Sequence, residues 1–340
     1  MVARGVLSFS GRPSIRSAAV AAGPLEKKKS RFAHLFDQFY DSELCGEETN
    51  EKAHSRMIED ACGLVLEKAE AMPADADFLL CGDLVNQMTP SNFAAANLHL
   101  PYIGLFSACA TSVSSLIAAA LLTEAGASRL TLAGSSSQHN AIERQFRYPI
   151  EYGFQKGPTA QWTVTAAGFA AVTPNEPGYP EIRHATVGRS VDYGLTDPLN
   201  MGAAMAPAAF DTLNRHLSGT GNTPDDYDAI ITGDLGSVGS SLFRNMAKDE
   251  GIEVKRSKWR DAGEEFYGDD PSFFAGASGA GCSAAVYFSD VFKRLMDGEY
   301  RRVLLIATGA LLSPLSFQQG DTIPCTAHSV ELVMGEGGES

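Results

Sequence analysis

The chain has 340 residues and carries 41 Asp and Glu against 27 Lys and Arg, a formal net charge of −14. That negative field disfavours nucleic acid and anionic lipid surfaces as partners at long range. Hydrophobic residues make up 44% of the chain and charged residues 20%, a balance that excludes a disordered chain and supports a sizeable core.

Residues 1–50 predict short strands and loops, with no apolar stretch long enough for a signal peptide. The first full helix is predicted at about residues 50–70. Six cysteines are scattered along the chain without a CxxC pair, which indicates neither a zinc site nor a disulfide framework and favours a reducing compartment.

Two stretches of the chain repeat each other. Residues 73–84 and 224–235 share six identities at one constant offset, and each is a Pro/Asp-rich loop, a short apolar strand and then Gly-Asp-Leu. A second pair, 108–134 and 280–309, repeats a small-residue helix, a glycine turn, an arginine and a strand. We therefore expect a duplicated chain with halves at 1–175 and 176–340.

Alternation of strands and helices in each half predicts an α/β fold, with a mostly parallel sheet that is covered on both faces. The small-residue helices would pack between the two sheets. Residues 103–122 carry no charge, but their serines and threonines favour a buried helix over a membrane span. The Gly/Glu-rich residues 331–340 predict a frayed tail.

Cys109 is the candidate reactive residue of the first half. A strand predicted at 102–106 leads through Ser107 and Ala108 to Cys109 and then into a helix. The positive end of a helix lowers a thiol pKa and activates the sulfur. A small cysteine packed in a tight core is an equally good interpretation of the local sequence.

This arrangement resembles the thiolase and ketoacyl synthase superfamily, in which the cysteine carries the acyl group and a His and a second His or Asn from the other half assist it. The resemblance implies a five-layer αβαβα fold. The expected partners are missing, because Asp234 follows the second-half strand where a His is expected, and 279–282 read Gly-Ala-Gly-Cys where an Asn is expected. His139 and His328 are possible substitutes, although structural hydrogen bonding is our preferred interpretation for both.

Residues 138–156, which follow the strand at 130–133, are rich in groups that bind carboxylates. Arg144 and Arg147 offer planar forks, Lys156 a point charge and Tyr148 a ring with a hydroxyl. The alternative is a surface loop held by salt bridges through Glu143 and Glu151.

The run Arg-Gln-Phe-Arg-Tyr-Pro at 144–149 closely resembles the stage V sporulation protein AD family of spore-forming bacteria. Supporting stretches lie at 23–26, 34–37, 82–84, 201–209, 307–314 and 323–328. The resemblance implies a protein that binds dipicolinic acid (pyridine-2,6-dicarboxylate), alone or as its calcium chelate. It further implies membrane-embedded partners of the same operon, a peripheral place at the spore inner membrane, and a role in dipicolinate uptake and release.

From these observations we expect a non-catalytic binding protein without a cofactor or a protein-bound metal, with a homodimer through the first-half sheet as a possibility. Two alternatives stay open: an acyltransferase that uses Cys109 with His328, and a scaffold subunit without a ligand. The predicted ligand site comprises Cys109, His139, Arg144, Arg147, Tyr148, Lys156, Asp234 and His328.

Overall fold

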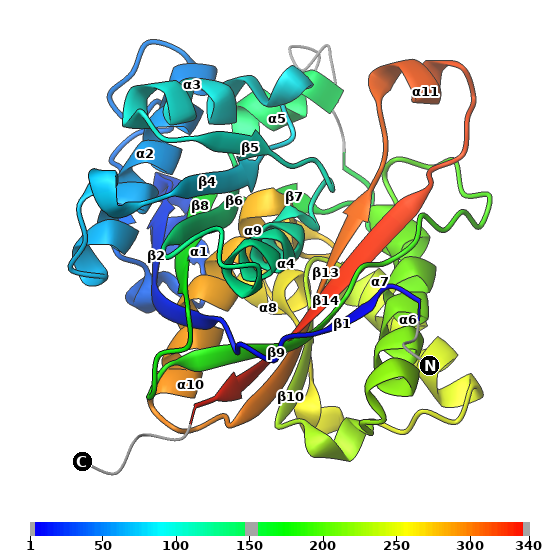
Figure 1. Cartoon of the computed structure of the whole chain (residues 1–340). Helices are drawn as coiled ribbons and strands as arrows, with labels where there is room; N and C mark the ends of the chain where they lie inside the picture. The colour runs from blue at the N-terminus through cyan, green and yellow to red at the C-terminus, as the bar shows by residue number, and fades with distance from the viewer. Residues whose placement is uncertain (1–3, 147–155, 336–340) are drawn as a thin grey trace.

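The computed structural model describes residues 4–146 and 156–335, so Arg147 and Tyr148 of the predicted site lie outside the described residues. Each half of the chain forms five principal strands in the same spatial order (Figure 1). In the first half the order is β2 (Ser14–Ala22), β8 (Ala166–Thr173), β6 (Thr131–Ser137), β4 (Phe78–Gly82) and β5 (Tyr102–Gly104). In the second half it is β9 (Pro180–Thr186), β14 (Cys325–Met334), β13 (Arg302–Ala310), β10 (Ala229–Thr232) and β11 (Trp259–Asp261).

Both sheets are mixed. The prediction of mostly parallel sheets is therefore wrong for the strands nearest the junction of the two sheets, β8 and β2 in the first and β14 and β9 in the second. β5, β4 and β6 are parallel, as are β11, β10 and β13. β8 runs antiparallel to β6 and β2, and β14 runs antiparallel to β13 and β9. In the second half the physical reason is the connection, because β13 passes into β14 without a helix that crosses over the sheet.

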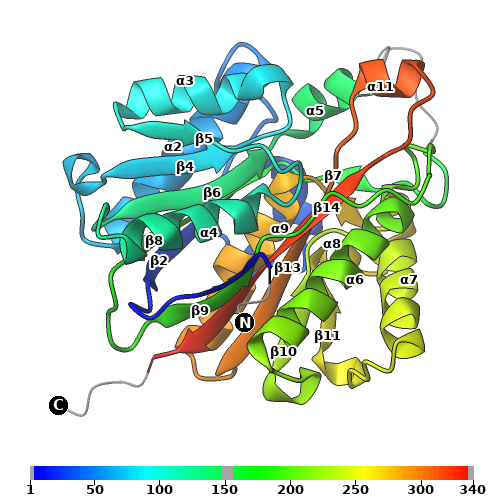
Figure 2. The same cartoon turned by 45° about the vertical axis from the view of Figure 1, so that its right-hand side comes forward.

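The helices and sheets form the expected layers, which the turned view in Figure 2 separates. α2 (Asn50–Lys68) and α3 (Thr89–Leu98) cover the outer face of the first sheet, and α6 (Met201–Thr220), with α7 (Gly236–Asp249) beside it, covers the second. α4 (Thr111–Glu124) and α9 (Ala280–Val286) lie between the sheets, where the largest hydrophobic cluster is found. The Ser112 and Ser283 hydroxyls, 2.8 Å apart, join these two helices.

The remaining elements are short. β1 (Val6–Ser8) pairs with β9, β3 (Gln38–Phe39) pairs with β2, and β7 (Trp162–Thr163) pairs with β12 (Ala277–Ser278) across the two halves. The short helices are α1 (Pro24–Lys29), α5 (His139–Phe146), α8 (Ala262–Phe266), α10 (Phe292–Met296) and α11 (Pro314–Gln318). The sheets meet at β2 and β9, and the link between β8 and β9 contains the boundary that we place at 175/176.

The duplication extends to individual hydrogen bonds. Asp77, just before β4, accepts from the backbone N–H groups of Arg129 and Leu130 at the start of β6. Asp228 does the same before β10, accepting from the N–H groups of residues 301 and 302 at the start of β13. Equivalent carboxylates thus fix the register of equivalent strand pairs.

Element boundaries agree with the sequence in part. The helix predicted at about 50–70 is α2, and the uncharged segment contains the buried helix α4. Within the described residues no helix combines the length and the apolar character that crossing a membrane requires. Two expectations were wrong: β2 is a long, buried strand inside the region expected to hold short ones, and β14 extends to Met334 where fraying was predicted.

Candidate functional site

Cys109 lies in the turn between β5 and α4, at the junction of the two halves. β5 ends at Gly104, two residues earlier than predicted, and α4 begins at Thr111 after an Ala110 N-cap. Ala108, directly before the cysteine, has φ of 49°, a left-handed conformation that is uncommon for a residue with a Cβ. Gly309 of β13 allows this turn to approach, because a Cβ there would lie 2.3 Å from the Ser107 carbonyl oxygen.

The Asp234 carboxyl group faces the Cys109 thiol from the second half. It accepts hydrogen bonds from the Ser278 hydroxyl at 3.0 Å, the Gly279 N–H at 3.1 Å and the Thr308 hydroxyl at 2.8 Å. The Cys109 thiol is a fourth hydrogen-bonding neighbour. Asp234 is fully buried, and its environment of donors is the one that a buried carboxylate needs.

This environment decides the chemistry of the thiol. Burial raises the pKa of Cys109 well above its usual range, and the charge and hydrogen bond of Asp234 raise it further. Together they outweigh the lowering of the thiol pKa by the N-terminus of α4, so the thiol is neutral at pH 7 and a poor nucleophile. Burial also raises the pKa of Asp234, against the lowering effect of its hydrogen-bond donors, Thr308 first among them.

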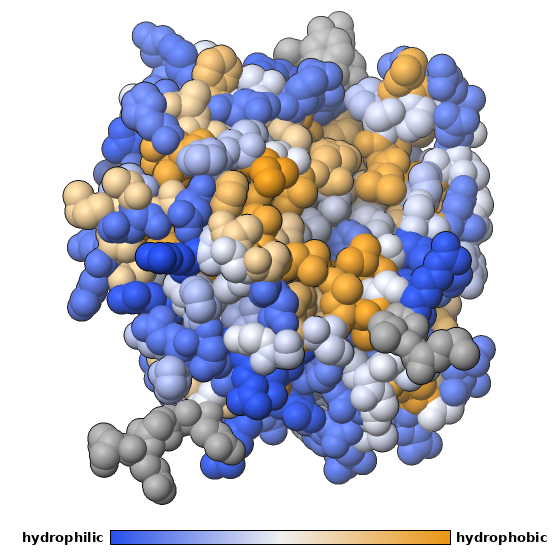
Figure 3. Space-filling model, viewed as in Figure 1, coloured by the Kyte–Doolittle hydropathy of each residue, from blue (hydrophilic) through white to orange (hydrophobic). Residues whose placement is uncertain are grey.

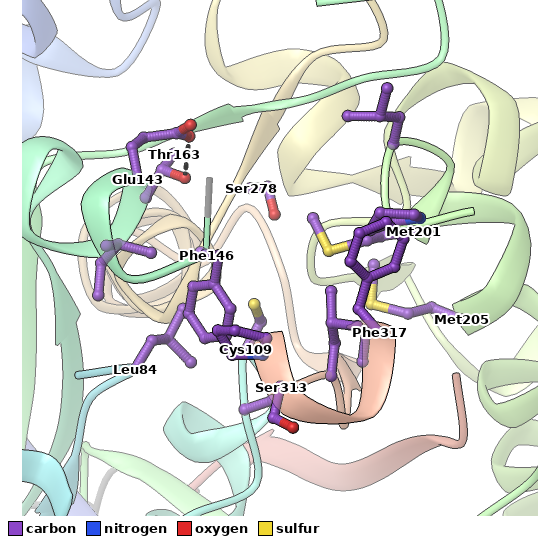
Figure 4. Close-up of a pocket in the computed structure, with 18 of the residues that line it drawn as sticks. Leu84, Cys109, Glu143, Phe146, Thr163, Met201, Met205, Ser278, Ser313 and Phe317 are labelled. Atoms are coloured by element: carbon purple, nitrogen blue, oxygen red, sulfur yellow. Dashed lines mark hydrogen bonds between the residues drawn. The ribbon is translucent and has the colours of Figure 1, made fainter. Parts of the chain in front are cut away.

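A pocket of about 500 Å³ opens above Cys109 and is lined by both halves (Figure 4). Its described walls are mainly apolar, and the charged side chains among them are two carboxylates, Glu143 and Asp197. The apolar and sulfur-bearing side chains that line it include Leu84, Phe106, Ile142, Phe146, Leu199, Met201, Met205, Leu312, Pro314 and Phe317.

A polar cluster supports the wall of the pocket at α5. Glu143 accepts from the Thr163 hydroxyl at 2.9 Å and pairs with Lys156 Nζ at 3.3 Å. Lys156 Nζ also donates to the Gln161 carbonyl oxygen and lies 4.4 Å from the centre of the Trp162 ring. The His139 ring stacks on the Trp162 ring, with their centroids 4.5 Å apart. The Glu143–Lys156 side chains are only 9% and 8% exposed, so the pair is a buried one.

Of the predicted site residues that the structure describes, Cys109 lines the pocket and Asp234 adjoins it. His139 begins α5, and its Nδ1 lies 2.9 Å from the Thr163 carbonyl oxygen. Arg144 is exposed and paired with Glu51 of α2, outside the described lining. Lys156 supports Glu143 from behind the wall.

His328 lies inside β14, not after a strand as the sequence suggested. Its Nδ1 accepts from the Gly188 N–H at 3.0 Å, and burial lowers its pKa to about 4, so the ring is neutral. The groups that influence the pKa of the Cys109 thiol include Asp234, Ser278 and the Gly279 N–H.

Sequence reasoning missed Ser278 and Thr308, which complete the surroundings of Asp234, and the pocket residues Phe146 and Phe317. Ser278 directly precedes the loop at 279–282 in which we sought an Asn, so the loop was correctly located but its polar residue was overlooked. Phe317 lies in the β13–β14 connection, and no sequence signal relates that connection to Cys109.

Solved structures show what fold this chain adopts. It is similar to 3-oxoacyl-[acyl-carrier-protein] synthase III from Aquifex aeolicus VF5, with a TM-score of 0.60 and 13% identity, covering 94% of this chain and 99% of that chain. It is also similar to human mitochondrial 3-ketoacyl-CoA thiolase, with a TM-score of 0.59 and 10% identity over 96% and 99% of the two chains. These likenesses confirm the thiolase-like α/β fold.

Sequence comparison is more specific. The family model described as stage V sporulation protein AD matches residues 3–333. The stage V sporulation protein AD of Bacillus subtilis (strain 168) is 45% identical over 316 residues, which cover 93% of each chain. The chain therefore belongs to the stage V sporulation protein AD family, a family of sporulation proteins with, here, a thiolase-like fold.

Proposed function

We propose that this protein binds dipicolinic acid in the pocket above Cys109 without catalysing acyl transfer. The observation that carries the non-catalytic part is the carboxyl group of Asp234 against the thiol. An acyl-transfer nucleophile needs a thiolate, and a neighbouring carboxylate opposes its formation. The proposed ligand follows from membership of the family and from a pocket whose size and apolar walls are typical of small-molecule sites.

The charges of the pocket bear on the form of the ligand. Asp197 repels a free dicarboxylate there, whereas the charge of Glu143 is offset by its ion pair with Lys156. The calcium chelate has no net charge and meets less repulsion. Asp83 and Asp234 are not free to complete the oxygen shell of a chelated calcium ion. Asp83 accepts from the N–H groups of Val85 and Ser91 and from the Ser91 hydroxyl, and Asp234 is similarly enclosed.

Calorimetric titration with dipicolinate, with and without equimolar calcium, tests the binding. We expect saturable binding and a higher affinity with calcium. Arg147 directly follows the pocket residue Phe146 in the chain, whereas the Arg144 head group is already paired with Glu51. We therefore expect Arg147→Ala to weaken binding about tenfold or more and Arg144→Ala, the matched control, to weaken it less. Equal affinity in both variants and the wild type removes the two arginines from the site.

An acyltransferase is the first alternative. It predicts a stable acyl-enzyme at Cys109 after incubation with an acyl thioester, and rapid alkylation by iodoacetamide at neutral pH. Mass spectrometry of the Cys109 peptide measures both. We expect neither, because burial and Asp234 keep the thiol protonated. A scaffold without a ligand is the second alternative, and calorimetry without any dipicolinate signal would support it.

We propose further that the protein acts in dipicolinate uptake during sporulation and release in germination, peripherally at the spore inner membrane, with membrane-embedded subunits of the same transport complex. The net charge of −14 supports attachment through a protein partner over attachment to anionic lipid. Co-sedimentation with vesicles that contain or lack those subunits tests this. Equal sedimentation with both would favour direct lipid contact.

A homodimer through the first-half sheet is also proposed. β5 is the edge strand of that sheet, and Ile103 on it and Phe106 just after it are 45% and 52% exposed. Figure 3 shows that hydrophobic side chains also gather near the middle of the molecular surface seen in this view. Pairing of two β5 edges would cover them. Sedimentation of wild type and Ile103→Asp tests it: a monomer in both rejects the dimer.

A further inference from the structure

The connection between β13 and β14 is a loosely held segment that reaches away from the body of the molecule (Figure 1). We call residues 311–322 the strap. The strands that carry it close at the Ala310–Cys325 pair, where the Leu311 N–H donates to the Pro324 carbonyl oxygen at 2.8 Å. Near its other end, the Ile323 N–H donates to the Leu195 carbonyl oxygen at 2.8 Å. The strap is thus anchored at its two ends.

Between these anchors the Thr322 hydroxyl donates to Asp192 at 2.5 Å, beside the Ile323 anchor, and the other printed hydrogen bonds of residues 312–321 are internal to the strap. The Ser313 hydroxyl caps α11 by accepting from the Ser316 N–H at 3.0 Å, and the Asp321 N–H donates to the Ser316 carbonyl oxygen at 3.0 Å. No residue of the strap is buried, and Leu315 is 64% exposed. A segment with internal hydrogen bonds and few buried contacts moves as a unit at low free-energy cost.

The inner side of this segment forms part of the pocket. Leu312, Ser313, Pro314 and Phe317 of the strap all line it. Figure 4 shows Phe146 and Phe317 on opposite sides of the pocket, with Cys109 beside Phe146 on the side that faces Phe317. Phe317 is 51% exposed and has no ring contact with another aromatic residue among those the structure describes.

We propose that the strap is a hinged flap, and that Phe317 is its specificity-determining residue, closing onto one face of a planar aromatic ligand while Phe146 holds the other side. A bound ring would supply the aromatic contact that Phe317 lacks among the described residues and would cover its exposed surface, which favours closure of the flap. This inference rests on the proposed binding of dipicolinate in the pocket. It adds the moving element and the residue that selects a flat ring.

Stopped-flow kinetics of calcium dipicolinate binding test the closing residue. We expect Phe317→Ala to raise the dissociation rate constant about tenfold, as loss of an aromatic contact predicts. Leu315→Ala is the matched control, since it lies in the same helix with an exposed side chain. It should leave the rate within about twofold. Equal rate constants for Phe317→Ala and wild type would show that Phe317 does not close onto the ligand.

Hydrogen exchange tests the movement itself. Amides of the strap should exchange quickly in the free protein and become protected when calcium dipicolinate is bound. Unchanged exchange of the strap in a protein that binds the ligand would show a static loop and reject the flap.

A measurement without ligand separates this inference from the proposed function. Replacing residues 313–320 by a short glycine linker opens the pocket, so N-ethylmaleimide should alkylate Cys109 faster at pH 9 than in wild type. If alkylation is faster while no dipicolinate binds to the wild type, the flap stands and the proposed ligand fails. If alkylation is not faster, the strap does not cover the pocket and the flap is rejected.

Discussion

The two Gly-Asp-Leu turns of the duplicated chain begin alike and end in different roles. Asp83 follows β4 and serves its own half, accepting from the Val85 N–H and from the N–H and hydroxyl of Ser91 in the first turn of α3. Asp234 follows the equivalent strand β10 but reaches the thiol of Cys109 in the other half. One motif therefore became a local cap in one half and part of an interdomain site in the other.

The site therefore combines a first-half thiol with a second-half carboxyl group, and neither half contains it alone. Both aspartates are fully buried and both are surrounded by donors. Only their surroundings distinguish a structural carboxylate from one that controls a thiol. Substitutions at the two positions should accordingly separate stability from thiol chemistry.

Asp83→Ala is expected to have the largest effect on stability. It leaves the Ser91 N–H and hydroxyl without their acceptor and removes a helix cap, a loss of about 3 kcal/mol in the free energy of unfolding. Chemical denaturation measures it. The pH dependence of Cys109 alkylation should stay as in wild type, and a changed profile would mean that the first turn also acts on the thiol.

Glu26 provides a buried carboxylate that, unlike the two aspartates, is incompletely satisfied. Its Oε1 accepts from the Tyr267 hydroxyl and the Thr165 N–H, but Oε2 has no hydrogen-bond partner among the described residues. Burial raises its pKa to about 7. The unfolded chain therefore releases this proton near pH 4.5 while the folded chain keeps it, and stability falls as pH rises between these values.

Glu26→Gln removes that contribution. Between pH 4.5 and pH 7.5 the free energy of unfolding of the wild type should fall by about 3 kcal/mol more than that of the variant, as the size of the Glu26 pKa shift predicts. Denaturation at both pH values measures the difference. Because Asp261, whose pKa burial also raises to about 7, is present in both proteins, the difference isolates Glu26. Parallel pH profiles would show that Glu26 ionises normally.

Asp234→Asn removes the charge beside the thiol. An amide keeps the shape of the carboxyl group but carries no charge, so the pKa of Cys109 falls toward its ordinary value. We expect iodoacetamide to alkylate Cys109 about tenfold faster at pH 8 than in wild type, equivalent to one pKa unit. Asp83→Asn is the control and should leave the rate unchanged. Equal rates in all three proteins contradict control of the thiol by Asp234.

Arg144→Ala should have the smallest effect. α5 carries two ion pairs, and the Arg144–Glu51 pair is exposed whereas the Glu143–Lys156 pair is buried. An exposed pair contributes about 0.5 kcal/mol or less to the free energy of unfolding. A thermal melt of Arg144→Ala should therefore be almost that of wild type. A large loss of stability would show that the arginine has a structural role beyond its contact with Glu51.

Much of the fold was predictable because local composition and repetition encode it. The repeated loop-strand-turn segments correctly indicated β4 and β10, and the small-residue helices were correctly placed between the sheets. The direction of β8 and β14 was not predictable, since buried strands look alike in sequence whether they pair in parallel or antiparallel. The position of Cys109 before a helix was also read correctly, but its pKa was not decided by that helix.

By itself, the sequence determined the family, the duplication and the presence of a cysteine without the expected imidazole and amide partners. These properties are written in the order and type of residues along the chain. The tertiary structure alone decided that Asp234 faces the thiol, that Glu143 with Lys156 supports the pocket wall, and that Phe317 lines it. Such contacts join residues far apart in the chain, and burial and charge act through distance in space, which sequence spacing does not measure.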